Sequence, residues 1–309
     1  MKAPQDMLNA AGPHAERIVE LWWITLAICA VVFVAILVAT GMALFKRRAP
    51  SGNRAHFAVA AAVGVSTIGL VTLIFLSFVT DRALAVMPGD DPLKIQVTAQ
   101  RWWWDARYED PQPARMFSTA NELHIPVGRT VEITLKATDV IHSFWVPNLG
   151  GKKDLIPGRP AILRLRADKP GLYRGQCAEF CGQQHAKMAL LVFARPPEEY
   201  EQWAAQQRAS APEPQTDEQK LGREVFVTGT CAMCHTIKGT DANGRKAPDL
   251  THLASRQTLA AGTLPNTRGH LARWIIDPHS IKPGVNMPSH TTLGTSELQA
   301  LLAYLGTLK

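Results

Sequence analysis

The stretch of the chain best suited to chemistry is Cys231-Ala-Met-Cys234-His235. Two thiols at this spacing can form thioether bonds with the vinyl groups of a haem, and the imidazole beside them can bind the iron. A zinc half-site or a thioredoxin-like redox pair would use the same thiols. Zinc would need a second pair of ligands, and no cysteine follows Cys234. The motif therefore predicts a covalently bound haem c with His235 as its proximal ligand.

The sixth iron ligand should come from a later part of the same region. The candidates are Met287, His252, His279 and His290. Met287 is favoured because Asn286-Met287-Pro288 resembles the loop that presents the distal methionine in class I c-type cytochromes. A thioether ligand also raises the reduction potential of the iron. Ala247-Pro248 resembles the segment of that family whose carbonyl orients the proximal histidine.

A second group of metal-binding residues lies upstream of this motif. His142, Cys181, His185 and Met188 provide the thiolate, two imidazoles and weak thioether of a blue-copper site. A further thiolate, Cys177, lies shortly before them. Two bridging sulfurs could hold two copper ions close together, so that a shared electron is transferred with little rearrangement. A resting disulfide, or a copper-delivery site like those of assembly factors, is the alternative interpretation.

Two long uncharged runs, residues 21–45 and 57–80, predict membrane-spanning helices. Each exceeds the ~20 residues that a helix needs to cross a bilayer. Residues 46–54 between them carry only positive charges, and acids follow the second run, so we expect a cytoplasmic loop with both termini outside. Residues 1–20 do not resemble a cleavable signal peptide, so the first helix should direct export unless a leader is missing from this sequence.

The remaining sequence predicts two domains outside the membrane. Short β-branched runs at 93–99, 130–136, 161–166 and 188–193, separated by Pro and Gly turns, indicate an all-β sandwich or barrel. Helical periodicity returns near the C-terminus. The expected architecture is multi-domain: an N-terminal tail (1–20), a two-helix transmembrane hairpin (21–82), a β-domain (91–200), a linker (201–216) and an all-α domain (217–309).

The overall charge gives no sign of nucleic-acid binding. The formal net charge is +7, and the basic residues are spread along the chain without a basic run outside the hairpin loop. No nucleic-acid partner is therefore expected.

The segment from Gly175 to Met188, together with His142-Ser-Phe-Trp-Val-Pro147, resembles subunit II of haem–copper cytochrome c oxidases. The likeness extends over residues from about 15 to 200. Residues 217–309 resemble the cytochrome c domain fused to this subunit in caa3-type bacterial oxidases. The resemblance implies a cupredoxin fold for the β-domain and a class I cytochrome c fold for the C-terminal domain.

The resemblance also implies the roles of individual residues. A dinuclear copper A centre would be bound by the side chains of His142, Cys177, Cys181, His185 and Met188 and by the backbone carbonyl of Glu179. The Glu179 carboxylate would reach a magnesium ion at the boundary with subunit I. Trp102 would take the position at which electrons enter the copper centre, although an aromatic cluster there is also ordinary packing.

The expected function is electron entry into a respiratory terminal oxidase in the bacterial inner membrane. Electrons would pass from a cytochrome c donor through haem c and copper A to subunit I, where oxygen is reduced to water with proton translocation. Subunit III is a further expected partner. A membrane-anchored electron shuttle or copper chaperone is the alternative. Nitrous oxide reductase would need a further His-rich copper cluster, and the scattered histidines do not provide one.

Overall fold

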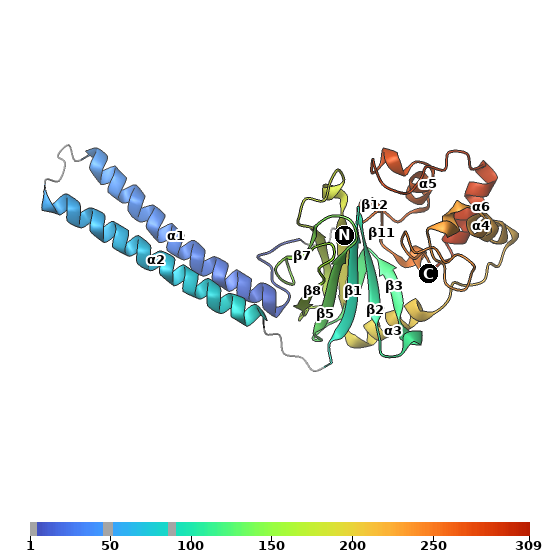
Figure 1. Cartoon of the computed structure of the whole chain (residues 1–309), viewed down its shortest axis with the longest axis horizontal. Coiled ribbons are helices and arrows are strands. Elements are labelled where there is room, and N and C mark those ends of the chain that lie inside the picture. Colours follow the sequence, from blue (N-terminus) through green and yellow to red (C-terminus); the bar gives the residue numbers. More distant parts are fainter. Residues whose placement is uncertain (1–4, 46–51, 86–90) are drawn as a thin grey trace.

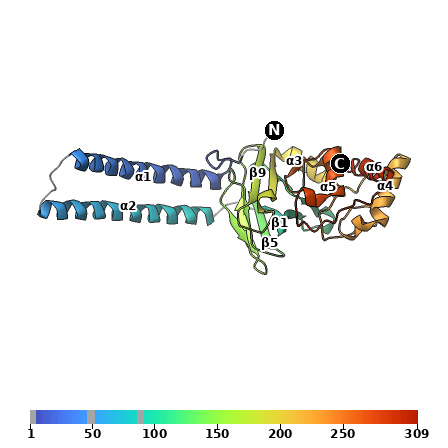
Figure 2. The same cartoon turned by 90° about the horizontal axis from the view of Figure 1, so that it is seen from above.

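A computed structural model describes residues 5–45, 52–85 and 91–309 of the chain. Its three parts follow one another in space as they do in sequence (Figures 1 and 2). A long helical hairpin lies on one side of a β-sandwich, and a small helical domain lies on the other side. This arrangement confirms the predicted fold class.

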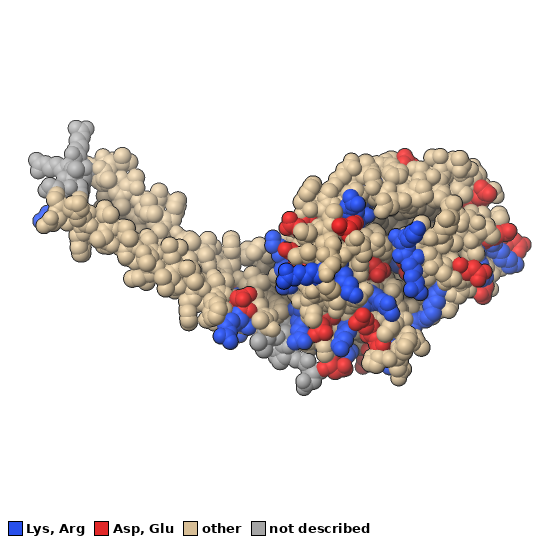
Figure 3. Space-filling view, in the orientation of Figure 1, with Lys and Arg blue, Asp and Glu red and all other residues tan. Residues whose placement is uncertain are grey.

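The hairpin consists of α1 (Pro13–Phe45) and α2 (Asn53–Ala85). Both helices are long and apolar enough to cross a membrane, and their most apolar stretches are not buried within the protein. The hairpin carries few charged side chains, whereas both signs are mixed over the rest of the surface in view (Figure 3). Most of the predicted cytoplasmic loop, residues 46–51, lies outside the described residues.

The segment before the hairpin packs on the sandwich, although the sequence predicts an N-terminal tail. The Ala11 amide donates to the carbonyl of Asn148 (2.8 Å), and the Asp168 amide donates to the carbonyl of Ala11 (2.7 Å). Gly12 is required there, because a Cβ would lie 1.9 Å from the carbonyl oxygen of Arg166. The start of α1 is thereby fixed to the sandwich.

Two five-stranded sheets form the sandwich. The first has the order β3-β2-β1-β5-β8 and the second β4-β10-β9-β6-β7; β1 pairs with β5, and β4 with β10, in parallel, while the other neighbours are antiparallel. The strands are β1 (Leu93–Gln100), β2 (Trp103–Glu109), β3 (Phe117–Ala120), β4 (Glu122–Pro126), β5 (Val131–Ala137), β6 (His142–Trp145), β7 (Lys153–Leu155), β8 (Ala161–Leu165), β9 (Gly171–Cys177) and β10 (Ala189–Arg195). The four predicted strands correspond to β1, β5, β8 and β10.

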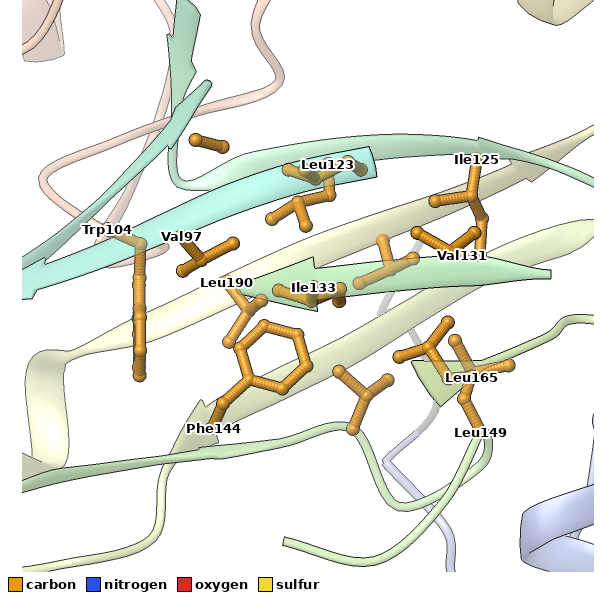
Figure 4. Close-up of a cluster of buried hydrophobic side chains, with 14 of the residues drawn as sticks. Val97, Trp104, Leu123, Ile125, Val131, Ile133, Phe144, Leu149, Leu165 and Leu190 are labelled. Carbon is orange, nitrogen blue, oxygen red and sulfur yellow. The ribbon is translucent and has the colours of Figure 1, made fainter. Parts of the chain in front are cut away.

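The core of the sandwich follows from alternating burial along its strands. In β1 and β5 every second side chain is buried, as period-2 alternation requires when one face of a sheet meets a core. Val97, Ile133, Leu190 and Phe144 meet between the sheets (Figure 4). Trp104 lies in the same cluster, toward the end of the sandwich that carries His142, and its ring centroid is 6.3 Å from that of His142.

Helix α3 (Pro197–Arg208) differs from the sequence prediction, which assigned residues 201–216 to a linker. Its Trp203 ring stacks on His124 at a centroid distance of 4.0 Å, and His124 stacks on Phe193 at 4.3 Å. The helix therefore belongs to the sandwich core as far as residue 208. Only residues 209–216 form the extended connection. The sequence prediction missed α3 because the helix contains few apolar residues, although its aromatic side chains are buried against the sandwich.

The C-terminal domain contains α4 (Asp217–Thr228), α5 (Arg268–Ile276) and α6 (Thr295–Leu305), with a short β11–β12 ribbon (Thr258–Leu259 and Leu264–Pro265). Thr216 and Gln219 form a capping box that fixes the start of α4. Helices α4 and α6 cross where Gly222 faces Ala300. Phe226, Leu301 and Leu305 are buried in the core of this domain.

Candidate copper and haem sites

One end of the sandwich brings the predicted copper ligands together. His142 begins β6, and Cys177 ends the neighbouring strand β9, where Phe144 is paired with Cys177. The loop that follows returns to β10 through the short 3₁₀ helix η2 (His185–Lys187), and Met188 directly precedes that strand. The Cys177 amide donates to the carbonyl of Met188 (2.9 Å), which closes the base of the loop.

The ligand atoms of His142, Cys177 and Cys181 all lie within 4.8 Å of one another, and the three residues are buried. Cys177 Sγ is 3.8 Å from His142 Nδ1, and Cys181 Sγ is 3.6 Å from His185 Nδ1. The Met188 sulfur lies 3.8 Å from Cys181 Sγ. Thiolate, imidazole and thioether are the donors that soft copper ions prefer. The five side chains therefore fit a copper centre built around two thiolates.

The backbone carbonyl of Glu179 lies in the same loop and is 3.1 Å from Cys177 Sγ. The Glu179 side chain itself is exposed, as is Phe180 beside it. The carbonyl is thus placed on the thiolate side of the loop, while the carboxylate lies at the surface.

The two thiols of this site perturb each other. A hydrogen bond from the Cys181 thiol holds the pKa of Cys177 well below its usual range, and His142 acts in the same direction. The same contact with Cys177 raises the pKa of Cys181, and burial raises it further. Two thiolates this close in a buried loop need a compensating positive charge, which bound metal ions would supply.

Asp139 orients His142 and was not identified from the sequence. Its Oδ1 lies 2.9 Å from His142 Nε2, so the Nδ1 atom faces Cys177. Asp139 is itself held by the amides of Arg101 and Val140, both at 2.7 Å. Metal-binding histidines usually have such a carboxylate partner. The available signal was an acid shortly before His142, in Asp139-Val-Ile-His142.

Trp102, the predicted electron-entry residue, lies against the copper loop. Its indole Nε1 donates to the carbonyl of Cys181 (2.9 Å), and its side chain is only 7% exposed. A Cβ at Gly182 would lie 3.3 Å from the ring, so Gly182 allows this close approach. The indole is thus hydrogen-bonded to a residue of the proposed ligand set.

The haem-attachment motif follows α4 directly. Cys231 lies in the 3₁₀ helix η3 (Thr230–Met233), and both thiols of the motif are free and partly buried. His235 Nδ1 is 2.7 Å from the carbonyl of Pro248, which leaves Nε2 as the atom that can bind iron. Burial is the main reason that the pKa of His235 is lowered, which favours the neutral imidazole needed for a metal bond. These residues fit a covalently bound haem.

The candidates for the sixth ligand differ in their surroundings. Met287 is partly buried and packs against the core of the C-terminal domain, as Cys231 does. His279 is exposed, and His290 is partly exposed. His252 is buried, but its Nδ1 lies 2.8 Å from the carbonyl of Lys309 at the end of the chain. The packing of Met287 is consistent with its proposed role as axial ligand.

The family comparisons cover both regions of the chain that carry the candidate sites. Residues 109–194 match the family model described as cytochrome c oxidase subunit II, periplasmic domain, and residues 219–309 match that of cytochrome c. Cytochrome c oxidase subunit 2 of Alkalihalophilus pseudofirmus is 33% identical, over 98% of this chain and 90% of that protein. The Bacillus subtilis protein of the same name is also 33% identical, over 71% of this chain and 63% of that protein.

Among solved structures, the periplasmic domain of subunit II of cytochrome oxidase from Bradyrhizobium japonicum is 30% identical. The match covers 40% of the present chain and 97% of the Bradyrhizobium japonicum chain, with a TM-score of 0.37.

Proposed function

This chain belongs to the cytochrome c oxidase subunit 2 family and carries a cytochrome c domain, and from this premise we propose that it is the electron-entry subunit of a respiratory terminal oxidase. The observation that carries the proposal is the convergence of His142, Cys177 and Cys181 within 4.8 Å in a chain that also carries Cys231-Ala-Met-Cys234-His235. Two redox sites of different chemistry on one chain suit a relay.

Within this proposal the copper centre is dinuclear copper A. The side chains of His142, Cys177, Cys181, His185 and Met188 would hold it, together with the carbonyl of Glu179. Cys231 and Cys234 would hold haem c through thioether bonds, and His235 and Met287 would bind its iron. The metal groups supply the electron transfer, and the polypeptide fixes their ligands and excludes water. An immobile ligand set keeps the reorganisation on oxidation and reduction small.

In this proposal a cytochrome c or a similar donor would supply the electrons, and the chain would pass them through the residues that would hold haem c and copper A toward subunit I. Oxygen is reduced to water on subunit I, with proton translocation. Glu179 and Phe180 are exposed on the copper loop, where subunit I can contact them. We propose a magnesium ion at the Glu179 carboxylate, at the boundary with subunit I. Subunit III is a further proposed partner.

The proposed location is the bacterial inner membrane. Helices α1 and α2 span it. The sandwich with α3, called the copper domain from here on, and the C-terminal domain, called the haem domain, lie on the periplasmic side. The contact between Ala11 and the sandwich would keep the sandwich next to the start of α1.

The experiment is a metal count and a spectrum of the complex, extracted in mild detergent with its native partners. We expect two copper ions and one covalent haem per chain, with the paramagnetic resonance signal of a shared copper electron. Cys181→Ser should abolish that signal and keep the haem absorbance. Cys29→Ser is the matched control, because Cys29 is exposed on α1, away from both sites. Two coppers retained in Cys181→Ser would rule out the bridging role.

A further inference from the structure

The haem domain makes specific contacts with the sandwich in addition to the covalent connection at 209–216. Two of its segments, 256–262 and 281–285, lie against the copper domain. The Ala189 amide donates to the carbonyl of Ala261 (3.1 Å), and Gln184 Nε2 donates to the carbonyl of Pro283 (2.8 Å). Val285 packs against the sandwich core. The two domains thus meet in one defined orientation (Figure 2).

A buried lysine lies at the centre of this contact. The Lys282 residue is 2% exposed, and its ammonium donates to the carbonyls of Trp102 (2.9 Å), Lys187 (2.8 Å) and Ala260 (3.1 Å). The first two acceptors belong to the copper domain and the third to the haem domain. An ammonium group has three N–H donors, so the three carbonyls satisfy it fully.

The burial of this charge has a cost that only a specific contact can offset. Burial first, and the charge of Lys187 second, lower the pKa of Lys282 to about 7. A buried cation is retained where acceptors replace its water, and those acceptors are correctly placed only while the domains are docked. Lys282 therefore discriminates between the docked arrangement and any shifted one.

An opposite charge on the copper domain makes a second anchor. The Glu122 residue is 3% exposed, and its Oε1 accepts hydrogen bonds from the amides of Gln257 (2.8 Å) and Thr258 (3.0 Å) and from the Thr258 hydroxyl (3.3 Å). Each domain thus inserts one buried charge into polar groups of the other. Two such anchors fix both the position and the rotation of the haem domain.

The lysine anchor also lies beside the proposed electron-entry residue. Lys282 binds the backbone carbonyl of Trp102, and the Trp102 indole binds the carbonyl of Cys181. A Cβ at Gly284 would lie 3.6 Å from the Trp102 ring, so the haem-domain loop covers the indole. This is the loop that continues to Met287. A continuous chain of contacts therefore joins the methionine loop of the haem domain to a proposed copper ligand.

We propose that Lys282 is a positioning residue that holds the haem domain permanently docked over Trp102, so that electrons reach the copper loop without a swing of the domain. This inference rests on the proposed function for its electron-transfer consequence, but the docking itself can be tested separately. It also requires an external donor to use the haem, because the chain's own loop covers Trp102.

The test places a protease site between Pro212 and Glu213, in the extended connection, within the full chain and its complex. After cleavage, covalent haem marks the released domain in gel filtration. We expect the cleaved wild-type domain to remain bound, and Lys282→Met to raise its dissociation constant at least tenfold. Lys246→Met is the matched control, because Lys246 is exposed on the same domain. Lys282→Gln, with fewer donors, provides a milder second variant.

Release of the wild-type domain on cleavage would overturn the docking, and equal retention of the Lys282 variants and Lys246→Met would overturn the role of Lys282. The second readout is the rate at which reduced haem reduces the copper centre in the uncleaved complex. Lys282→Met should slow it at least tenfold with the haem potential unchanged, and an unchanged rate would also refute the proposal. A wild-type complex without copper would refute the proposed function. Whether the haem domain stays bound after cleavage would still show whether the two domains are docked.

Discussion

The close packing of α4 against α6 in the haem domain can be tested quantitatively with the substitution Gly222→Ala. A Cβ at Gly222 would lie 2.0 Å from the carbonyl oxygen of Ala300, 2.5 Å from its carbonyl carbon and 2.8 Å from Tyr304 Cβ. Ordinary contacts begin near 3.4 Å. The helices must therefore separate by more than about 1 Å, and none of the three contacting atoms belongs to the movable end of a side chain.

The cost of this substitution follows from two opposing effects. Overpacking of a core costs about 1–3 kcal/mol or more, and the backbone atoms at this crossing place Gly222→Ala at the upper end. Alanine recovers about 1 kcal/mol through its higher helix propensity. We expect a net loss of about 2 kcal/mol in the free energy of unfolding, which corresponds to a melting temperature lower by roughly 8–15 °C for a domain of this size.

The assay is thermal unfolding of the full chain followed at the haem absorbance, which reports the haem domain alone. Gly269→Ala is the matched control, because Gly269 lies in α5 and its Cβ would meet no atom within 4 Å. That variant should unfold at the wild-type temperature or slightly above it. A melting temperature of Gly222→Ala equal to that of Gly269→Ala would refute the close-packing argument.

Three further outcomes are expected. Asp139→Ala removes the partner of His142 Nε2 and should lower copper affinity about 10–100-fold in chelator competition; unchanged affinity would contradict its orienting role. Met287→Leu should leave haem attached but lower its reduction potential, and an unchanged potential in a redox titration would assign the sixth ligand to a histidine. Burial first, and Asp249 second, raise the pKa of Asp105 to about 6. The folded state then binds that proton more tightly, so stability should fall as pH rises from about 4 to about 6. Asp105→Asn should remove this pH dependence and be about 1–3 kcal/mol more stable than the wild type at pH 7. If denaturant titrations showed the same pH dependence of the free energy of unfolding in both proteins, Asp105 would not be its source.

The chemistry of both sites could be predicted from the sequence because most of the proposed ligands, although not His142 or Met287, lie close together in it. Cys231, Cys234 and His235 fall within one short turn, and the residues from Cys177 to Met188 form a single loop. Local spacing of this kind needs no knowledge of the fold. The hairpin could be predicted for a related reason, since two uncharged runs longer than ~20 residues are each long enough to cross a bilayer as a helix.

Contacts between distant residues were decided by the tertiary structure. The pairing of β6 with β9 brings His142 to Cys177, and the same fold turns Asp139 toward the imidazole. Helix α3 belongs to the sandwich through stacking on His124, although its composition resembles a linker. The docking of the haem domain depends on Lys282 meeting carbonyls far away in the sequence. A backbone carbonyl is present at every residue, so no sequence pattern marks which three will surround a buried ammonium; only the packed domains place them there.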